Sequence, residues 1–153
     1  MAGRGTPAIQ ALERAAVAFS VHEYPHEEGA SYGAEVAEKL GLDPRCVLKT
    51  LVADVDGTLT VAMVPVCEQL DLRTLGKRVA LADARSAERA TGYVLGGISP
   101  LGQRKRLPAV LDETALLHAT VHVSAGRRGL EVELAPADLV ALTGARVAPI
   151  ARR

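Results

Sequence analysis

"CVLKTLVADVDGTLTVAMVPV", residues 46–66, decides the fold of this 153-residue chain. Two runs rich in Val, Leu and Thr flank Asp56-Gly57, a dipeptide that favours two-residue hairpin turns. Residues of these types suit a pleated, half-buried surface. The stretch therefore predicts an antiparallel hairpin, with its first strand over 46–55, and the rest of the chain must pack around it.

Helices and strands are expected on both sides of this hairpin. Thr6 suits a helix N-cap and Pro7 the first helical position. The remaining patterns predict a strand at 19–24, a helix at 31–40 ending at Gly41, short helices at 71–77 and 83–90 capped by Asp71 and Asp83, a hairpin at 119–135, and a helix from Pro136 to Gly144. No linker or repeat divides the sequence. We expect one α+β domain over residues 1–153, with a mixed, mostly antiparallel sheet.

Composition excludes several classes of protein. Lys plus Arg (18) balance Asp plus Glu (18), so nucleic-acid binding would need a local basic patch. Four aromatic residues, one Phe and three Tyr, are too few for a base-stacking platform. No apolar run is long enough to cross a bilayer, and the N-terminus lacks the apolar core of a secretory signal. With two cysteines, the chain is expected to be cytoplasmic, with reduced thiols and no membrane partner.

Lys49 is the most informative single residue. In an undistorted strand it shares one face with Val47 and Leu51, whereas Thr50 points to the other face. Both faces are largely apolar, so the ammonium must reach a polar cavity, pair with an anion or lose its proton. Two interpretations remain open here: an edge-strand lysine that extends to solvent, and a cation at the floor of a cleft that contacts a phosphate, carboxylate or carbonyl.

The second feature is "TGYVLGGISPLGQRKRLP", residues 91–108. Gly96 and Gly97 permit positive φ and expose backbone N–H groups, which can hold a phosphate or an oxyanion. We expect such a conformation at Gly97. The following cations Arg104, Lys105 and Arg106 could hold a polyanion. The alternative is an ordinary connection followed by a charged strand edge, since no P-loop or dinucleotide fingerprint is present.

Other chemistry is not expected. His118 and His122 lie four residues apart on a predicted strand, which separates them by about 13 Å, too far for one zinc ion. His22 and His26 straddle a strand end. The sequence therefore predicts neither a metal site nor a cofactor. Cys46 and Cys67 lack a catalytic signature and are expected to be structural.

These segments resemble a known family. "TPAIQALERAAVAFSVHEYPH", "VLKTLV", "TGYVLGGISPLGQRKRLP" and "VHVSAGRRGLEVEL" are similar to the free-standing Cys-tRNA(Pro) deacylases of YbaK/EbsC type, relatives of the editing domain inserted in bacterial prolyl-tRNA synthetases. The resemblance implies a barrel-like sheet with surrounding helices. It also implies site residues: Lys49 and Gly97 as catalytic; Tyr24, Thr50, Gly96, Ile98, Ser99 and Pro100 as substrate-binding; and Arg104, Lys105 and Arg106 as contacts to tRNA phosphates. Glu131 is assigned no role.

The implied reaction is hydrolysis of the ester between a mischarged amino acid and the terminal adenosine of tRNA(Pro). In the family the substrate's own cysteine thiol is thought to attack its ester, so that proximity supplies much of the acceleration. The expected partners are the acceptor end of mischarged tRNA(Pro) and prolyl-tRNA synthetase. Two alternatives stay open: a deacylase for another small aminoacyl-tRNA such as Ala-tRNA(Pro), and a non-catalytic module that binds aminoacyl-tRNA or a synthetase.

Overall fold

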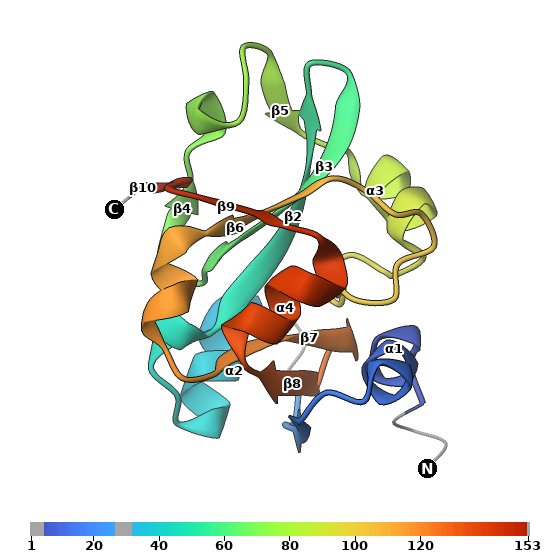
Figure 1. The fold of residues 1–153 in the computed structure, drawn as a ribbon, viewed down its shortest axis with the longest axis vertical. Helices are drawn as coiled ribbons and strands as arrows, with labels where there is room; N and C mark the ends of the chain where they lie inside the picture. The colour runs from blue at the N-terminus through green and yellow to red at the C-terminus, as the bar shows by residue number, and fades with distance from the viewer. Residues whose placement is uncertain (1–4, 27–31, 153) are drawn as a thin grey trace.

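The computed structural model describes residues 5–26 and 32–152 of the chain, and folds them into helices packed around β-sheets (Figure 1). The helices are α1 (Pro7–Ala15), α2 (Tyr32–Leu40), α3 (Ala84–Thr91) and α4 (Pro136–Thr143). The strands are β1 (Phe19–Glu23), β2 (Leu48–Val55), β3 (Thr58–Pro65), β4 (Gln69–Leu70), β5 (Val79–Leu81), β6 (Ala109–Asp112), β7 (Val121–Arg127), β8 (Leu130–Leu134), β9 (Arg146–Ala148) and β10 (Ala151–Arg152). Short 3₁₀ turns lie between them: η2 (Pro44–Cys46), η3 (Leu72–Thr74) and η4 (Glu113–Leu117).

Local sequence signals placed most of these elements correctly. The hydroxyl of Thr6 caps α1 by accepting a hydrogen bond from the Ile9 N–H at 3.2 Å. Asp83 caps α3 in the same way, accepting from the Ser86 N–H at 2.7 Å. Asp71 caps only the short turn η3 in place of the helix expected at 71–77. The predicted start of α2 at residue 31 lies outside the described residues.

The strands form a mixed sheet system, which confirms the α+β class. One sheet has the order β1-β8-β7, a second the order β5-β2-β3-β6-β9, and β10 pairs with β4. Pairing is antiparallel except for β3-β6 and β6-β9, which are parallel. The sequence analysis missed β4, β5, β6, β9 and β10, because strands of two to four residues carry little periodicity. The described strands do not close into a barrel, so the barrel-like arrangement is only a loose description.

One bridge joins the two large sheets. Val47, just before β2, pairs with His122 of β7 in a parallel orientation. Beyond it, one face of β2 and the inner face of β7 and β8 enclose the main core. The side chains of Leu48, Val123 and Leu130 are fully buried there, together with residues from α1 and α4. Burial of this apolar surface is the main source of stability.

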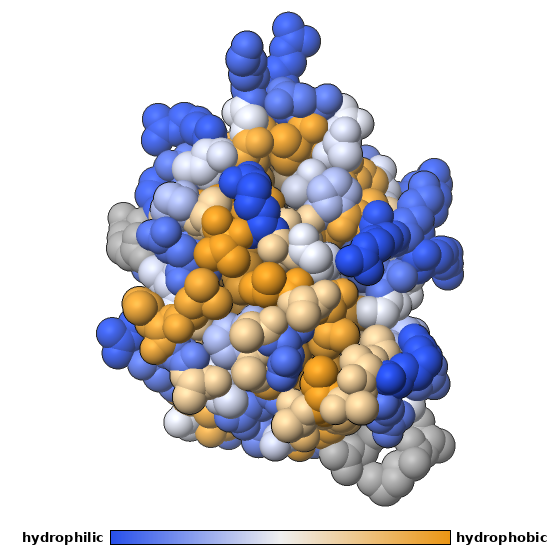
Figure 2. Space-filling view, viewed as in Figure 1, coloured by the Kyte–Doolittle hydropathy of each residue, from blue (hydrophilic) through white to orange (hydrophobic). Residues whose placement is uncertain are grey.

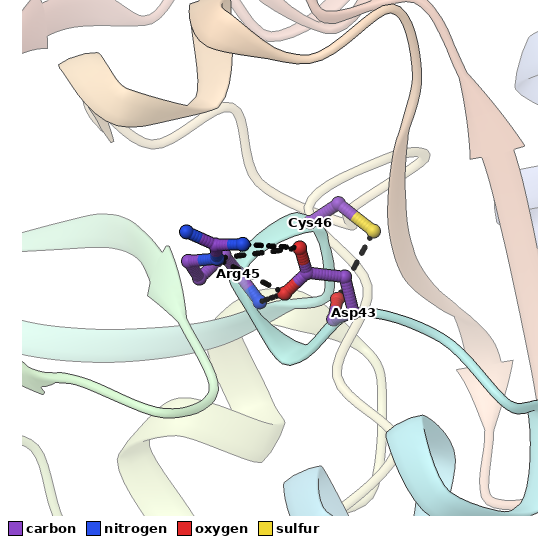
Figure 3. Close-up of polar contacts among 3 residues, drawn as sticks. All are labelled: Asp43, Arg45 and Cys46. Atoms are coloured by element: carbon purple, nitrogen blue, oxygen red, sulfur yellow. Dashed lines mark hydrogen bonds and ion pairs between the residues drawn. The ribbon is translucent and has the colours of Figure 1, made fainter.

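The turn η2 sets the path of the chain into β2 (Figure 3). The side chain of Asp43 accepts a hydrogen bond from the Arg45 N–H at 2.9 Å and pairs with its guanidinium at 3.0 Å. The Cys46 thiol donates to the Asp43 carbonyl oxygen at 3.1 Å. This compact turn ends three residues before Lys49, at the entrance to β2.

Apolar surface gathers over the region of α4 and its neighbours on the face shown in Figure 2. Exposed large apolar residues in adjoining elements include Leu116 and Leu117 of η4 and Val147 of β9. None of the helices in the described ranges has the length and apolarity that a membrane span requires.

A buried carboxylate fastens the C-terminal segment to the sheet. Asp112 ends β6 and is 1% exposed. Its Oδ1 accepts hydrogen bonds from the N–H groups of Ile150 at 3.0 Å and Ala151 at 2.9 Å, while Oδ2 accepts from Thr114. Burial by itself would raise the pKa of Asp112, but these hydrogen bonds outweigh it and hold the pKa below the ordinary value of 3.8.

We expect Asp112→Asn to lower the free energy of unfolding by about 1–3 kcal/mol at pH 7, because an amide nitrogen cannot accept the hydrogen bonds of the oxygen it replaces. The depressed pKa stabilises the fold above pH 3.8, and this contribution is lost as the pH falls through the folded-state value. Urea unfolding at neutral and acid pH should therefore show the gap between wild type and variant narrowing in acid. Glu113→Gln, at an exposed neighbouring carboxylate, is the control and should show no such gap.

Candidate active site

The two predicted faces of β2 are present, and they separate Lys49 from Thr50. Thr50 pairs with Met63 of β3 on the face that builds the main core. Its hydroxyl is buried and has no hydrogen-bond partner among the described residues. Lys49 pairs with Val64 on the opposite face. The ladder has no bulge here, so the two side chains do not enter one cleft from the same side.

A row of polar side chains crosses the strands on the Lys49 face. The β-ladders place His22 of β1 opposite Glu131 of β8, and Glu131 opposite Ser124 of β7. The parallel bridge between Val47 and His122 continues this register, so that Lys49 follows Ser124 two residues further along both strands. Lys49 and Glu131 therefore share one face but lie two strands apart, and at about 4.8 Å per strand their backbones are about 10 Å apart.

Glu131 is the residue that sequence reasoning missed in this row. Its side chain is fully buried, at 0% exposure, and Ser124 beside it is 2% exposed. A carboxylate is almost never fully buried without specific partners. Alternation along "LEVEL" could have placed Glu131 on the same face of β8 as Glu133, but its full burial depends on the tertiary fold, in which Val36 of α2 packs with Tyr24 and Val47 in a separate buried cluster.

Tyr24 lies directly after β1 and is held by its backbone, whose N–H donates to the Gly129 carbonyl at 3.0 Å. Burial raises the pKa of Tyr24 to about 12, and the negative charges of Glu131 and Glu35 add to this rise. The phenol is therefore neutral at physiological pH and keeps its proton for donation. Its buried hydroxyl has no hydrogen-bond partner within the described part of the chain, which leaves it available to a ligand.

Lys49 is half-buried, and this burial lowers the pKa of its ammonium, while the nearby Cys67 thiol opposes the shift. Burial disfavours the charged form of both residues, the phenolate of Tyr24 and the ammonium of Lys49, so it raises the first pKa and lowers the second. The site contains a neutral hydroxyl donor and a lysine whose proton is held less tightly than usual. Both properties are typical of groups that move or share protons.

The glycine loop differs in one respect from expectation. Gly96, not Gly97, has the left-handed conformation, with φ +90°. The Gly97 N–H donates to the Val94 carbonyl at 2.9 Å, so it is already used in a turn and cannot be the oxyanion donor that the sequence analysis expected. Among the described residues, no acceptor receives the N–H of Ile98, which makes it the better candidate. Ile98, Ser99 and Pro100 are all buried.

Both glycines lie against the β7–β8 turn, but glycine is required at each for a different reason. A Cβ on Gly97 would lie 2.8 Å from the Arg127 Cα, and one on Gly96 would lie 2.3 Å from the Arg128 Nε. Backbone cannot yield at 2.8 Å, so position 97 has no room for a Cβ; the Arg128 side chain can move, and the φ of +90° is what favours glycine at position 96. The loop thus reaches Tyr24 through this turn, since Gly129 binds the Tyr24 backbone.

Arg128 is a second residue that the sequence analysis did not single out. Its guanidinium covers Gly96, and its Nη1 lies 3.2 Å from the His26 Nε2. His26 in turn lies 2.6 Å, through Nδ1, from the Glu35 carboxylate of α2. The motif "GRRG" indicated only a turn, because the partners of its arginines come from distant segments. Arg128 places an exposed cation beside the loop and the Tyr24 segment.

The three cations after the loop are exposed, as expected for contacts to a polyanion. The N–H groups of Arg104 and Lys105 donate to Thr91 and Ala90, which fixes this segment against the end of α3. A groove of about 220 Å³ is lined by Pro100, Lys105 and Arg106 among others. It connects the end of the glycine loop with the basic cluster.

Comparison with known proteins identifies the class. The model for aminoacyl-tRNA editing domains matches residues 26–142. A protein named Cys-tRNA(Pro)/Cys-tRNA(Cys) deacylase EbsC, from Enterococcus faecalis (strain ATCC 700802 / V583), is 35% identical over 151 residues, which cover 95% of this chain and 92% of that relative. The fold and the polar site together define an aminoacyl-tRNA editing protein.

Solved structures agree with this class. A crystal structure of a trans-editing enzyme for prolyl-tRNA synthetase has a TM-score of 0.85 at 28% identity and covers 96% of each chain. The hypothetical protein APE2540 has a TM-score of 0.84 at 25% identity, covering 95% of this chain and 99% of its own. The chain belongs to the family of aminoacyl-tRNA editing domains, and the resemblance seen in the sequence is confirmed.

We expect Gly97→Ala to lower both stability and activity, because the added methyl group would push the loop away from the Arg127 backbone. Overpacking of this kind costs about 1–3 kcal/mol, measurable by urea unfolding. Gly41→Ala is the control: its φ of +66° gives some strain, but no atom lies within 4 Å of the added Cβ. The control should lose stability without loss of turnover per folded molecule, and equal losses of turnover in both variants would contradict a role for the loop position.

Proposed function

We propose that this protein is a trans-editing hydrolase that deacylates mischarged Cys-tRNA(Pro). One observation carries the proposal: a neutral Tyr24 hydroxyl, a half-buried Lys49 and a buried Glu131 lie on one face, in a chain 35% identical to a relative named as a Cys-tRNA(Pro)/Cys-tRNA(Cys) deacylase. Neither described cysteine has surroundings that activate it. Burial raises the pKa of the Cys46 thiol, and Cys67 is exposed at the surface.

The reaction needs no nucleophile from the protein. The thiol of the esterified cysteine attacks its own carbonyl carbon, the bond from that carbon to the ribose 3′ oxygen breaks, and the thiol proton passes to that oxygen. The tRNA leaves with a free 3′-hydroxyl, and water opens the cyclic thioester to cysteine. Because thiol and carbonyl are tethered, the protein supplies mainly orientation and charge stabilisation.

The site residues have complementary roles in this scheme. Lys49, whose pKa is lowered by burial, accepts the proton of the attacking thiol and passes it to the departing ribose oxygen, so that the lysine ends the step in its starting state. The Tyr24 hydroxyl donates to the developing oxyanion, assisted by the Ile98 N–H of the glycine loop. Gly96, Ser99 and Pro100 shape the loop that receives the aminoacyl group, and Arg128 faces the same space. Thr50, on the core face of β2, supports the strand from behind.

Charge distribution supports action in trans with a partner. The chain has 18 basic and 18 acidic residues, so affinity for tRNA comes from the local cluster Arg104–Arg106 and the exposed arginines of the β7–β8 turn. Few neutralised phosphates give weak, salt-sensitive binding. A synthetase that presents the mischarged acceptor end would compensate for it, and one structural relative is described as a trans-editing enzyme for prolyl-tRNA synthetase. Prolyl-tRNA synthetase is therefore the proposed partner.

Single-turnover deacylation of tRNA(Pro) charged with Cys, Ala or Pro tests the function directly. We expect rapid release of Cys only, and loss of about 100- to 1000-fold in rate for Lys49→Ala, the range seen when one group that stabilises the transition state is removed. Lys77→Ala, at an exposed lysine, is the matched control and should retain the wild-type rate. Equal rates on Cys- and Ala-charged tRNA would contradict attack by the substrate thiol.

A double substitution, Arg104→Ala with Lys105→Ala, should act on binding instead. Removing two phosphate contacts is expected to weaken tRNA affinity and to flatten its dependence on salt concentration by about two units of logarithmic slope. Turnover at saturating tRNA should remain close to wild type. Filter binding across a salt series, combined with single-turnover rates, measures both effects. A drop in saturating turnover with unchanged binding would move these cations from the tRNA path into the reacting centre.

A further inference from the structure

Two histidines and a glutamate from three strands meet on the polar face next to the proposed active site. His22 comes from β1, His122 from β7 and Glu133 from β8, the strand between them. The metal-binding atoms of the three residues all lie within 4.8 Å of one another. The His22 Nε2 lies 2.9 Å from one carboxylate oxygen of Glu133, and the His122 Nε2 lies 4.0 Å from the other.

The His122 ring is the observation that an internal ion pair does not explain. This residue is 3% exposed, and its Nδ1 is buried with no hydrogen-bond partner in the described ranges. Its Nε2 is too far from Glu133 for a hydrogen bond. Buried polar groups are normally satisfied, and an exception calls for a ligand or ion. The His122 Nε2 thus faces a carboxylate oxygen at 4.0 Å without binding it, while Nδ1, the other nitrogen of the same ring, has no partner either.

From this geometry we propose that His22, His122 and Glu133 form a binding site for a divalent transition-metal ion such as Zn²⁺. Two imidazoles and one carboxylate are a recognised ligand set for zinc that leaves a position open for water or another ligand. Bonds of about 2.0–2.2 Å to a tetrahedral ion place ligand atoms roughly 3.4 Å apart. The widest spacing, at most 4.8 Å, must therefore shrink by up to about 1.4 Å, and the partly exposed side chains of His22 and Glu133 can supply this movement.

A second interaction holds the carboxylate in place. The Thr120 hydroxyl donates to the Glu133 Oε2 at 2.5 Å, which is the kind of outer contact that orients ligands in metal sites. The sequence analysis missed this cluster because it compared the spacing of histidines only along a single strand. The β-ladders bring together residues that are 11 and 111 positions apart in the sequence.

Metal binding would clamp the edge strand β1 to β7 across β8. His22 lies two residues before Tyr24, so the clamp would also fix the strand that positions the Tyr24 hydroxyl. The proposed metal does not take part in ester cleavage, and the cluster can therefore be tested without any tRNA substrate.

Isothermal titration with ZnCl₂, and the visible absorption of the Co²⁺-loaded protein, test the proposal. We expect one Zn²⁺ per chain, a raised melting temperature with Zn²⁺, and the intense absorption of tetrahedral Co²⁺. His22→Asn and Glu133→Gln should each weaken Zn²⁺ binding by at least about 10- to 100-fold, which is the loss typical when only an outer contact to a metal ligand is removed. His118→Asn, which removes a histidine outside the cluster, is the control and should bind normally.

Circular dichroism will show whether a ligand substitution prevents folding. If it does, Thr120→Val provides a milder variant. It should fold and weaken Zn²⁺ binding by about tenfold. Binding weaker than millimolar in the wild type would overturn the proposal. So would equal affinity in wild type, Glu133→Gln and Thr120→Val. Because none of these measurements involves deacylation, failure of the proposed function would leave their result unchanged.

Discussion

The bridge between Val47 and His122 is the contact on which the rest of the site depends. It joins β2, from the five-stranded sheet, to β7, from the three-stranded sheet. Without it, Lys49 would belong to one sheet and Glu131 to another, with no defined relation between them. With it, alternation along the strands gives both sheets a common pair of faces: one encloses the main core, and the other holds Lys49, Ser124 and Glu131 beside buried apolar residues such as Val47.

This arrangement brings ionisable groups into low-dielectric surroundings, and their pKa values respond. Burial raises the pKa of Tyr24 to about 12 and lowers that of Lys49. In the proposed reaction one proton moves from the substrate thiol to the ribose oxygen. The site therefore needs groups that stabilise charge in the transition state, and it does not need a group that keeps the proton afterwards. Arg128 supplies a permanent cation at the rim, where solvent stabilises it and its charge can still reach a carbonyl or phosphate.

Sequence reasoning reached those parts of the structure that depend on local chemistry. Asp56-Gly57 specified the hairpin, Thr6 and Asp83 specified helix starts, and alternation separated Lys49 from Thr50. It failed where distant segments decide the outcome. β6 and β9 join the parallel part of the sheet with only four and three residues, too few to show a period. The burial of Glu131 and the contact of Arg128 with Gly96 both require the tertiary fold, whereas the Gly97 N–H is used in a local turn with Val94 that residue types alone did not reveal.

The contact between the glycine loop and the β7–β8 turn has a consequence for how freely each side can change in evolution. The atom nearest to Gly97 is the Cα of Arg127, which every amino acid possesses. Position 127 can therefore accept many side chains so long as the backbone keeps its path, whereas position 97 has room for hydrogen alone. Two surfaces that touch each other are thus under unequal selection: one can drift in sequence, and the other must remain constant for the contact to survive.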